Sequence, residues 1–99
     1  MRYDITLYVG HNVNGVQTWT DGDVVKCAHK HGIMGATAIS VMGIWNGEIE
    51  NTTMLEICDC EAYFRAHIET VIVPAMCADL QQQEIMFKCT ESHVRFITA

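Results

Sequence analysis

The first segment of the chain alternates hydrophobic and polar residues, which predicts a half-buried β-strand over residues 2–9. Its apolar face is predicted to carry Tyr3, Ile5, Leu7 and Val9. Gly and Asn residues at positions 10–15 then indicate a turn. Similar alternation predicts three later strands, over residues 36–45, 49–58 and 85–89. Residues 93–97 are predicted either to continue the last of these strands past a bulge or to form a short fifth strand.

The two middle strands are predicted to form a hairpin. Asn46-Gly47 lies between them, and this dipeptide is the strongest two-residue signal for such a turn. On the first of these strands, the alternation places Thr37, Ile39 and Val41 together on one face. On the second strand, the predicted core face carries Thr53, Leu55 and Ile57, and the opposite face carries Thr52, Met54 and Glu56.

Two helices complete the predicted elements. Thr20 and Asp23 resemble a capping box with Asp in place of Glu, and the short helix that they begin is expected to end before Gly32. Asp59 is predicted to cap a longer helix over residues 60–80, which Pro74 should kink or split. The predicted apolar side of that helix carries Phe64, Ile68, Val71, Ile72 and Ala75.

The predicted order is β-α-β-β-α-β, which is typical of the ferredoxin-like α+β fold. We therefore expect residues 1–99 to form a single domain with a four-stranded antiparallel sheet and both helices on one face. The open face of this sheet is predicted to be half apolar, and such a face favours self-association. Its predicted members are Tyr8, Ser40, Met42, Met54 and Met86.

Composition restricts the function. The 99 residues are 49% hydrophobic and 18% charged, which is typical of a folded chain. Six Lys and Arg against twelve Asp and Glu give a net charge of −6, which argues against nucleic-acid binding and against binding to anionic membranes. No signal segment and no apolar run of membrane-spanning length is present, so a soluble cytoplasmic protein is expected.

The five cysteines are an odd number in a chain without a secretion signal, which favours reduced thiols. Cys58 and Cys60 form C-x-C, and no second pair repeats that spacing. Cys27 and His31 stand one helical turn apart and could share a ligand, but the sequence indicates no further donor. No metal site is therefore predicted.

The residues that best suit chemistry lie around the middle hairpin. Glu48 and Glu50 follow Trp45 and are two positions apart, which places both carboxylates on one face of a strand. Such a pair can hold a cation, or one member can act in acid–base chemistry. Gln83 and Glu84 stand just before the last strand. A solubilising acidic pair and a polar connection are the plainer alternatives.

Two short motifs carry a family resemblance: Gly-x-Trp-x-Gly-Glu-x-Glu-x-Thr over residues 43–52, and Gln-Glu-x-Met-Phe over residues 83–87. Together with the order of elements, they resemble the phage-encoded S-adenosylmethionine lyases, formerly called hydrolases. That family belongs to a wider group of PII-like, ferredoxin-like trimers. The two-residue turn at Asn46-Gly47 replaces the long signalling loop of true PII proteins, which favours the lyase branch.

The resemblance implies a homotrimer with sites between subunits, no cofactor, and a role in anti-restriction in the host cytoplasm. The substrate's own carboxylate would attack Cγ and expel 5′-methylthioadenosine, leaving homoserine lactone. Glu50 or Glu48 would face the sulfonium or the amino group, and the resemblance leaves open which one. Gln83, Glu84 and Trp45 would bind the substrate, with Tyr8 and Met42 completing the predicted site.

Two other functions stay open at this point. The same clefts could bind an adenosyl or nucleotide ligand without turnover, although no phosphate-binding glycine loop or basic cluster favours ATP. Alternatively, the chain could be a small phage or plasmid protein that acts through protein contacts alone. Substitution of Glu50 would then leave function intact, whereas polar changes at Met54 or Met86 would abolish it.

Overall fold

A computed structural model describes residues 1–99. The sheet strands are β1 (Arg2–Gly10), β4 (Thr37–Trp45), β5 (Glu48–Glu61) and β6 (Met86–Glu91). A small separate hairpin is formed by β2 (Asn12–Val13) and β3 (Val16–Gln17). The helical elements are α1 (Asp21–Lys30), α2 (Ala62–His67), the π-helical turn η1 (Ile68–Ile72) and α3 (Val73–Asp79).

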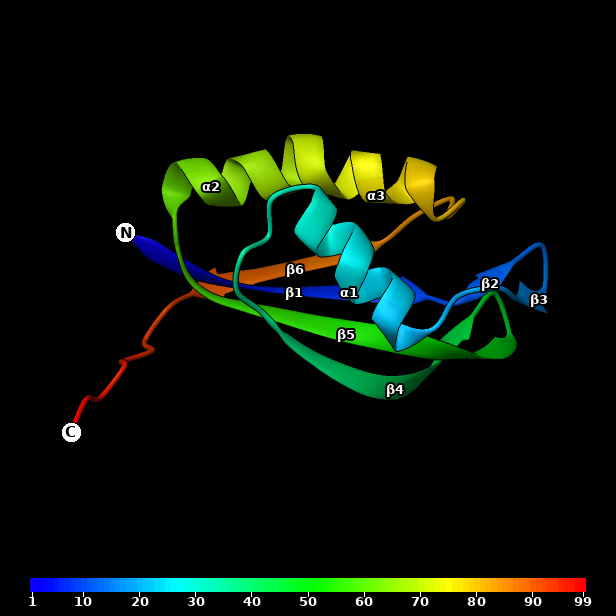
Figure 1. The fold of residues 1–99 in the computed structure, drawn as a ribbon, viewed down its shortest axis with the longest axis horizontal. Helices are drawn as coiled ribbons and strands as arrows, with labels where there is room; N and C mark the ends of the chain where they lie inside the picture. Colours follow the sequence, from blue (N-terminus) through cyan, green and yellow to red (C-terminus); the bar gives the residue numbers. More distant parts are fainter.

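The four strands pair antiparallel in the order β4-β5-β1-β6. Both helical segments cover the same face of this sheet, and the β2–β3 hairpin extends beyond the end of β1 (Figure 1). The predicted ferredoxin-like α+β fold is therefore confirmed. None of the helices is long and apolar enough to cross a membrane.

The core lies between the sheet and the helices. The predicted inward residues of β1 and β5 are confirmed, because Leu7, Val9 and Thr53 are fully buried and Leu55 is 1% exposed. Both strands occupy the centre of the sheet, where one face meets the helices and the other does not. The helices contribute Val24, Cys27, Ala28, Ile68, Ile72, Val73, Met76 and Leu80 to the same cluster.

The predicted faces of β4 are wrong. Ser40 pairs with Thr53, whose side chain is buried beneath the helices, so Ser40 and Met42 point to the helical side. Ile39 instead pairs with Met54 on the open face. Because β4 is an edge strand with most positions exposed on both sides, its alternation marks no core. The apolar row across the open face is therefore Ile39, Met54, Tyr8 and Met86.

The long helix from α2 to α3 is continuous (Figure 1). Its π-helical turn, η1, ends at Ile72, two residues before Pro74. Proline has no N–H to donate, and the altered hydrogen bonding of the π-helical turn before it accommodates that loss without breaking the helix. A π-turn shifts the residues that follow it around the helix axis. Val71, predicted inward, lies within this turn and is 51% exposed, whereas Val73, directly after the turn, is buried.

Two predictions at element ends are also wrong. Asp59 does not cap the second helix, because it lies within β5, which extends to Glu61. Its carboxylate instead accepts a hydrogen bond from Nε of Arg2 at 3.0 Å. Residues 92–99 form no strand, and the C-terminal segment leads away from the sheet (Figure 1).

The predicted caps and the hairpin turn are otherwise confirmed. Asn46 and Gly47 have φ values of 50° and 80°, as a tight two-residue hairpin turn requires. The hydroxyl of Thr20 accepts from the backbone N–H of Asp23, whose carboxylate accepts from the N–H of Thr20. Gly32 follows the C-cap of α1 with φ 103°.

Candidate functional site

A polar cleft opens at the end of the sheet where three turns meet. Its walls come from the start of the β2–β3 hairpin, the β4–β5 hairpin and the connection between α3 and β6. Three glutamates line it, no Lys, Arg or His does, and its single hydrophobic lining residue is Trp45. The cleft therefore suits a ligand with positive charge and an aromatic group.

Five of the seven site residues predicted from the sequence line this cleft: Trp45, Glu48, Glu50, Gln83 and Glu84. The other two do not. Tyr8 lies half-buried in the apolar row of the open face, beside Met54 and Met86. Met42 lies on the helical side of the edge strand and is 72% exposed. For these two residues, contact with a ligand stays a prediction.

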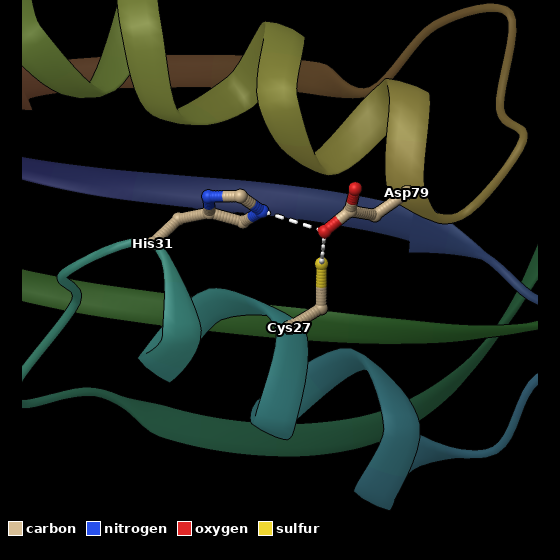
Figure 2. Close-up of side chains that lie close together, drawn as sticks. All are labelled: Cys27, His31 and Asp79. Atoms are coloured by element: carbon tan, nitrogen blue, oxygen red, sulfur yellow. Dashed lines mark hydrogen bonds and ion pairs between the residues drawn. The ribbon is translucent and has the colours of Figure 1, made fainter.

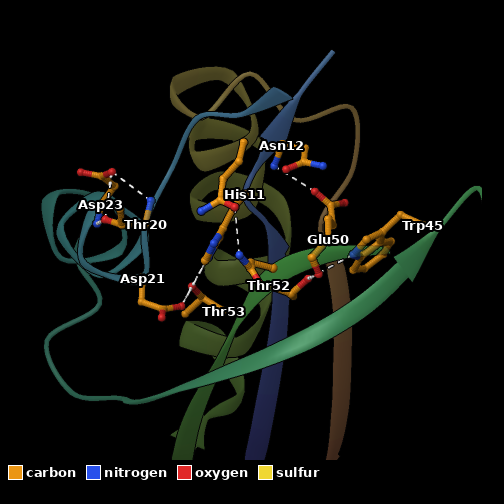
Figure 3. Close-up of polar contacts among 11 residues, drawn as sticks. His11, Asn12, Thr20, Asp21, Asp23, Trp45, Glu50, Thr52 and Thr53 are labelled. Carbon is orange, nitrogen blue, oxygen red and sulfur yellow. Dashed lines mark hydrogen bonds and ion pairs between the residues drawn. The ribbon is translucent and has the colours of Figure 1, made fainter. Parts of the chain in front are cut away.

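Glu50 is held in a fixed position. Its Oε2 accepts a hydrogen bond from the backbone N–H of Asn12 at 2.9 Å, as Figure 3 shows. The carboxylate also lies across Gly10, where an added Cβ would come within 2.7 Å of Oε1. A glycine at position 10 therefore lets this carboxylate approach the end of β1. Glu48, by contrast, is exposed beside the hairpin turn.

Trp45 is positioned by the same pairing of β4 with β5. Its indole N–H donates to Oγ1 of Thr52 at 3.2 Å, and the Thr52 side chain is 1% exposed. The indole lies close against Gly43, where a Cβ would fall 2.6 Å from Nε1. Because Gly43 pairs directly with Glu50, the indole and the Glu50 carboxylate share one side of the sheet.

The connection after α3 is tied to the opposite wall of the cleft. The side-chain amide of Gln82 donates to the backbone carbonyl of Asn12 at 2.9 Å and to that of Leu80 at 3.2 Å. Gln81 adopts a positive φ of 52°, which turns the chain sharply. This turn leaves Gln83 and Glu84 exposed at the cleft.

A buried polar network supports this end of the sheet from the helical side. His11 is 3% exposed, and its Nε2 lies 2.7 Å from Oγ1 of Thr53. The Thr53 hydroxyl donates to the Asp21 carboxylate at the start of α1 (Figure 3). Since that hydroxyl has one proton, it must accept from the ring, which places a proton on Nε2 of His11. The His11 backbone N–H also donates to the carbonyl of Asn51 at 3.0 Å.

This network fixes the residues on either side of the Glu50 contact. His11 precedes Asn12, which donates to the Glu50 carboxylate, and Thr53 lies on the same strand as Glu50. The hydrogen bond from the Thr53 hydroxyl is the main cause that lowers the pKa of Asp21, and partial desolvation opposes it. Hydrogen bonds with Ser40 and with the ring of His11 lower this pKa further. The ionised carboxylate is therefore the form that the fold prefers.

We expect Asp21→Asn to lower the free energy of unfolding at pH 7 by about 1 kcal/mol. This is less than the contribution of a buried hydrogen bond to a charged group, because the Asp21 carboxylate is partly exposed. A lowered pKa stabilises the fold above the unfolded-state value of about 3.9, and this contribution is lost as the pH falls through the folded-state pKa. Urea denaturation at pH 7 and at about pH 3 should therefore show that the difference in unfolding free energy between the wild type and Asp21→Asn is smaller at the lower pH. Glu69→Gln, at an exposed helix position, is the control. An equal deficit at both pH values would contradict the assignment.

The sequence alone did not identify Gly10, Asn12 and Gln82 as part of the site. Gly10 and Asn12 stood in a segment with ordinary turn chemistry, and Gln82 stood in a polar run of three glutamines. Their roles depend on the pairing of Gly10 with Thr52, which brings the end of β1 beside Glu50.

No protein-family model matches the chain, and no curated protein sequence matches it. The structure is similar to that of a phage S-adenosylmethionine lyase in complex with S-methyl-5′-thioadenosine, with a TM-score of 0.76 and 21% identity, over 91% of this chain and 81% of that one. A phage S-adenosylmethionine lyase in its apo state matches with a TM-score of 0.74 and 21% identity, over 89% of this chain and 78% of that one. The chain therefore has the fold of these phage lyases.

Proposed function

We propose that this protein is an S-adenosylmethionine lyase that converts S-adenosylmethionine to 5′-methylthioadenosine and homoserine lactone. The observation that carries the proposal is the cleft itself, in which three carboxylates and one indole gather without any basic side chain. The shared fold supports it, since a solved phage lyase of this fold is in complex with the methylthioadenosine product.

The reaction needs no cofactor and no protein nucleophile. The substrate's carboxylate oxygen forms a bond to Cγ while the bond from Cγ to sulfur breaks, and its electron pair goes to the sulfur. The negative carboxylate and the positive sulfonium are both neutral afterwards, so no proton is transferred. The protein's task is to fold the methionine arm into a near-attack conformation and to hold its charged groups.

Glu50 is the better of the two acids for that task. Its carboxylate is held by the N–H of Asn12, so it can hold the substrate's ammonium or sulfonium group at a defined position. Glu48 lies in the exposed hairpin and can attract the cation without fixing it. Gln83 and Glu84 would bind the polar groups of the substrate from the opposite side of the cleft.

Trp45 would stack against the adenine ring. We expect Trp45→Ala to weaken methylthioadenosine binding about tenfold, because stacking of a base on an aromatic ring contributes about 1–3 kcal/mol. Trp45→Phe keeps an aromatic face and should restore most of the affinity, although it loses the hydrogen bond to Thr52. Isothermal titration calorimetry measures both values. Tyr63→Ala, at an exposed aromatic residue on α2, is the control. Unchanged affinity in Trp45→Ala would contradict stacking at this residue.

We further propose that the protein is a homotrimer in which a neighbouring protomer closes the cleft. The cleft of one protomer has a volume of about 230 Å³, below the ~300–1,000 Å³ of typical ligand pockets. Exposed apolar side chains at the β4–β5 hairpin support self-association: Met42, Ile44 and Ile49. Tyr8 and Met42 lie outside the cleft of their own protomer and on opposite faces of the sheet, so each would contact a substrate only across its own subunit interface. Sedimentation velocity gives the subunit number, and a monomer with full activity would contradict the proposal that a neighbouring protomer closes the cleft.

In an infected bacterium, removal of S-adenosylmethionine would deprive restriction systems that depend on it, so an anti-restriction role in the host cytoplasm belongs to the same proposal.

Incubation of the purified protein with S-adenosylmethionine, followed by chromatography, should show methylthioadenosine. Saturable binding without product would instead select a binding module. Neither binding nor product, even at high protein concentration, would leave a protein that acts through its contacts with other proteins.

A further inference from the structure

A second cluster of reactive side chains lies in the helical layer and shares no residue with the cleft. Cys27 and His31 stand one turn apart at the end of α1, and Asp79 is the last residue of α3. The Cys27 sulfur, a His31 ring nitrogen and an Asp79 carboxylate oxygen all lie within 4.8 Å of one another. Figure 2 shows the three side chains pointing toward one another between the two helices.

The contacts converge on a single oxygen. Oδ2 of Asp79 lies 2.7 Å from Nε2 of His31, 3.0 Å from Nζ of Lys30 and 4.0 Å from Sγ of Cys27. In a tetrahedral zinc site with ordinary bond lengths, donor atoms stand about 3.3–3.7 Å apart. The observed distances lie on both sides of this range, so small side-chain rotations would place the three donors around one ion.

The types of donor select the ion. A thiolate and an imidazole are ligands of borderline-soft metals such as Zn²⁺, whereas Mg²⁺ and Ca²⁺ require oxygen donors. The Cys27 side chain is anchored in the core, with 8% of its surface exposed. The outer side of the cluster opens into a shallow depression lined also by Trp19, Lys26 and Lys30, which gives a path for the ion and room for a water ligand.

We propose that Cys27, His31 and Asp79 bind one Zn²⁺ ion per chain, with water in the fourth position, and that the ion joins α1 to α3. Lys30, whose side chain is 68% exposed, would turn into solvent and leave Asp79 to the ion. Binding releases the proton of the Cys27 thiol to solvent. In the free protein Nε2 of His31 donates to the Asp79 carboxylate, so on binding its proton moves through solvent to Nδ1 and leaves Nε2 free to bind the ion. Because α3 leads directly into residues 81–84, the ion would also restrain one wall of the cleft.

Titration of the reduced protein with Co²⁺, a spectroscopic substitute for Zn²⁺, tests this site. We expect a thiolate-to-cobalt absorption band and intense tetrahedral d–d bands that saturate at one equivalent and disappear on addition of Zn²⁺. Cys27→Ser should abolish the thiolate band, and Asp79→Asn should weaken Co²⁺ binding at least tenfold. Circular dichroism establishes that each variant is folded; Asp79 is exposed, so its variant tests the site even where Cys27→Ser fails to fold.

Cys58→Ser is the matched control, because Cys58 is an exposed thiol near the carboxylates of Asp4, Glu56 and Asp59. This variant should keep the whole cobalt spectrum. Zn²⁺ should also raise the unfolding temperature of the wild type and of Cys58→Ser, but not that of Asp79→Asn. The proposal is overturned if the reduced wild type gives no thiolate band, if the band persists in Cys27→Ser, or if it is lost in Cys58→Ser.

Discussion

Replacement of Glu50 by Gln should reduce kcat/KM for S-adenosylmethionine by about 100-fold or more, the range found when a preorganised electrostatic partner is removed. Gln has the same shape, and its amide oxygen can still accept the hydrogen bond from the Asn12 N–H. The variant loses only the negative charge that would hold the cationic substrate. We therefore expect it to fold and assemble as the wild type does, which circular dichroism and sedimentation velocity measure.

Glu48→Gln is the matched control for this experiment. It removes the same charge from the same cleft, but from an exposed side chain beside the hairpin turn. We expect a loss of less than about tenfold, because an exposed charge contributes mainly through screened attraction. A larger loss in Glu48→Gln than in Glu50→Gln would assign the central role to Glu48. Unfolding of Glu50→Gln would show instead that this carboxylate is structural.

Gly10→Ala should produce a similar loss of turnover without any change in charge. An added Cβ would lie 2.7 Å from the Glu50 carboxylate, so the carboxylate must move away and lose its contact with the Asn12 N–H. Gly10 has no positive φ, so alanine fits the backbone. Because the clash is with the end of a flexible side chain, we expect a cost of about 1–2 kcal/mol in unfolding free energy and a fall of about 100-fold in kcat/KM.

Two comparisons make this prediction specific. Gly35→Ala introduces the same methyl group where no atom lies within 4 Å, and it should leave activity unchanged. The double variant Gly10→Ala/Glu50→Gln should be no less active than Glu50→Gln alone, because both changes act on one carboxylate. Full activity in Gly10→Ala, or additive losses in the double variant, would mean that the position of Glu50 is unimportant for turnover.

The sequence pattern predicted the fold best where the two faces of an element have different surroundings. In β1, Leu7 is buried by the helices and Tyr8 is only half-buried, so the alternation carries the true orientation. In β4, an edge strand, both faces are largely exposed, and apolar residues such as Ile44 face solvent. The alternation there gave the wrong face for Ser40 and Met42.

The part of the candidate site that depends on short spacings along the sequence was predictable. Trp45, Glu48 and Glu50 belong to one hairpin, and the order of elements brings the start of the last strand to the same end of the sheet. The contact of Gly10 with Glu50 depends on strand register, which no local pattern encodes. The position of Asp79 beside Cys27 depends likewise on how two helices pack, 52 residues apart in the chain.

The most direct test of the proposed lyase activity is mass spectrometry of the products formed from S-adenosylmethionine in ¹⁸O-labelled water. The proposal predicts methylthioadenosine in an amount equal to the substrate consumed, together with homoserine lactone that carries no ¹⁸O at early times, and neither product at a comparable rate with Glu50→Gln. Homoserine labelled in its hydroxyl group as the first product would show attack by water instead. No methylthioadenosine at high concentrations of the wild-type protein would contradict the proposed activity altogether.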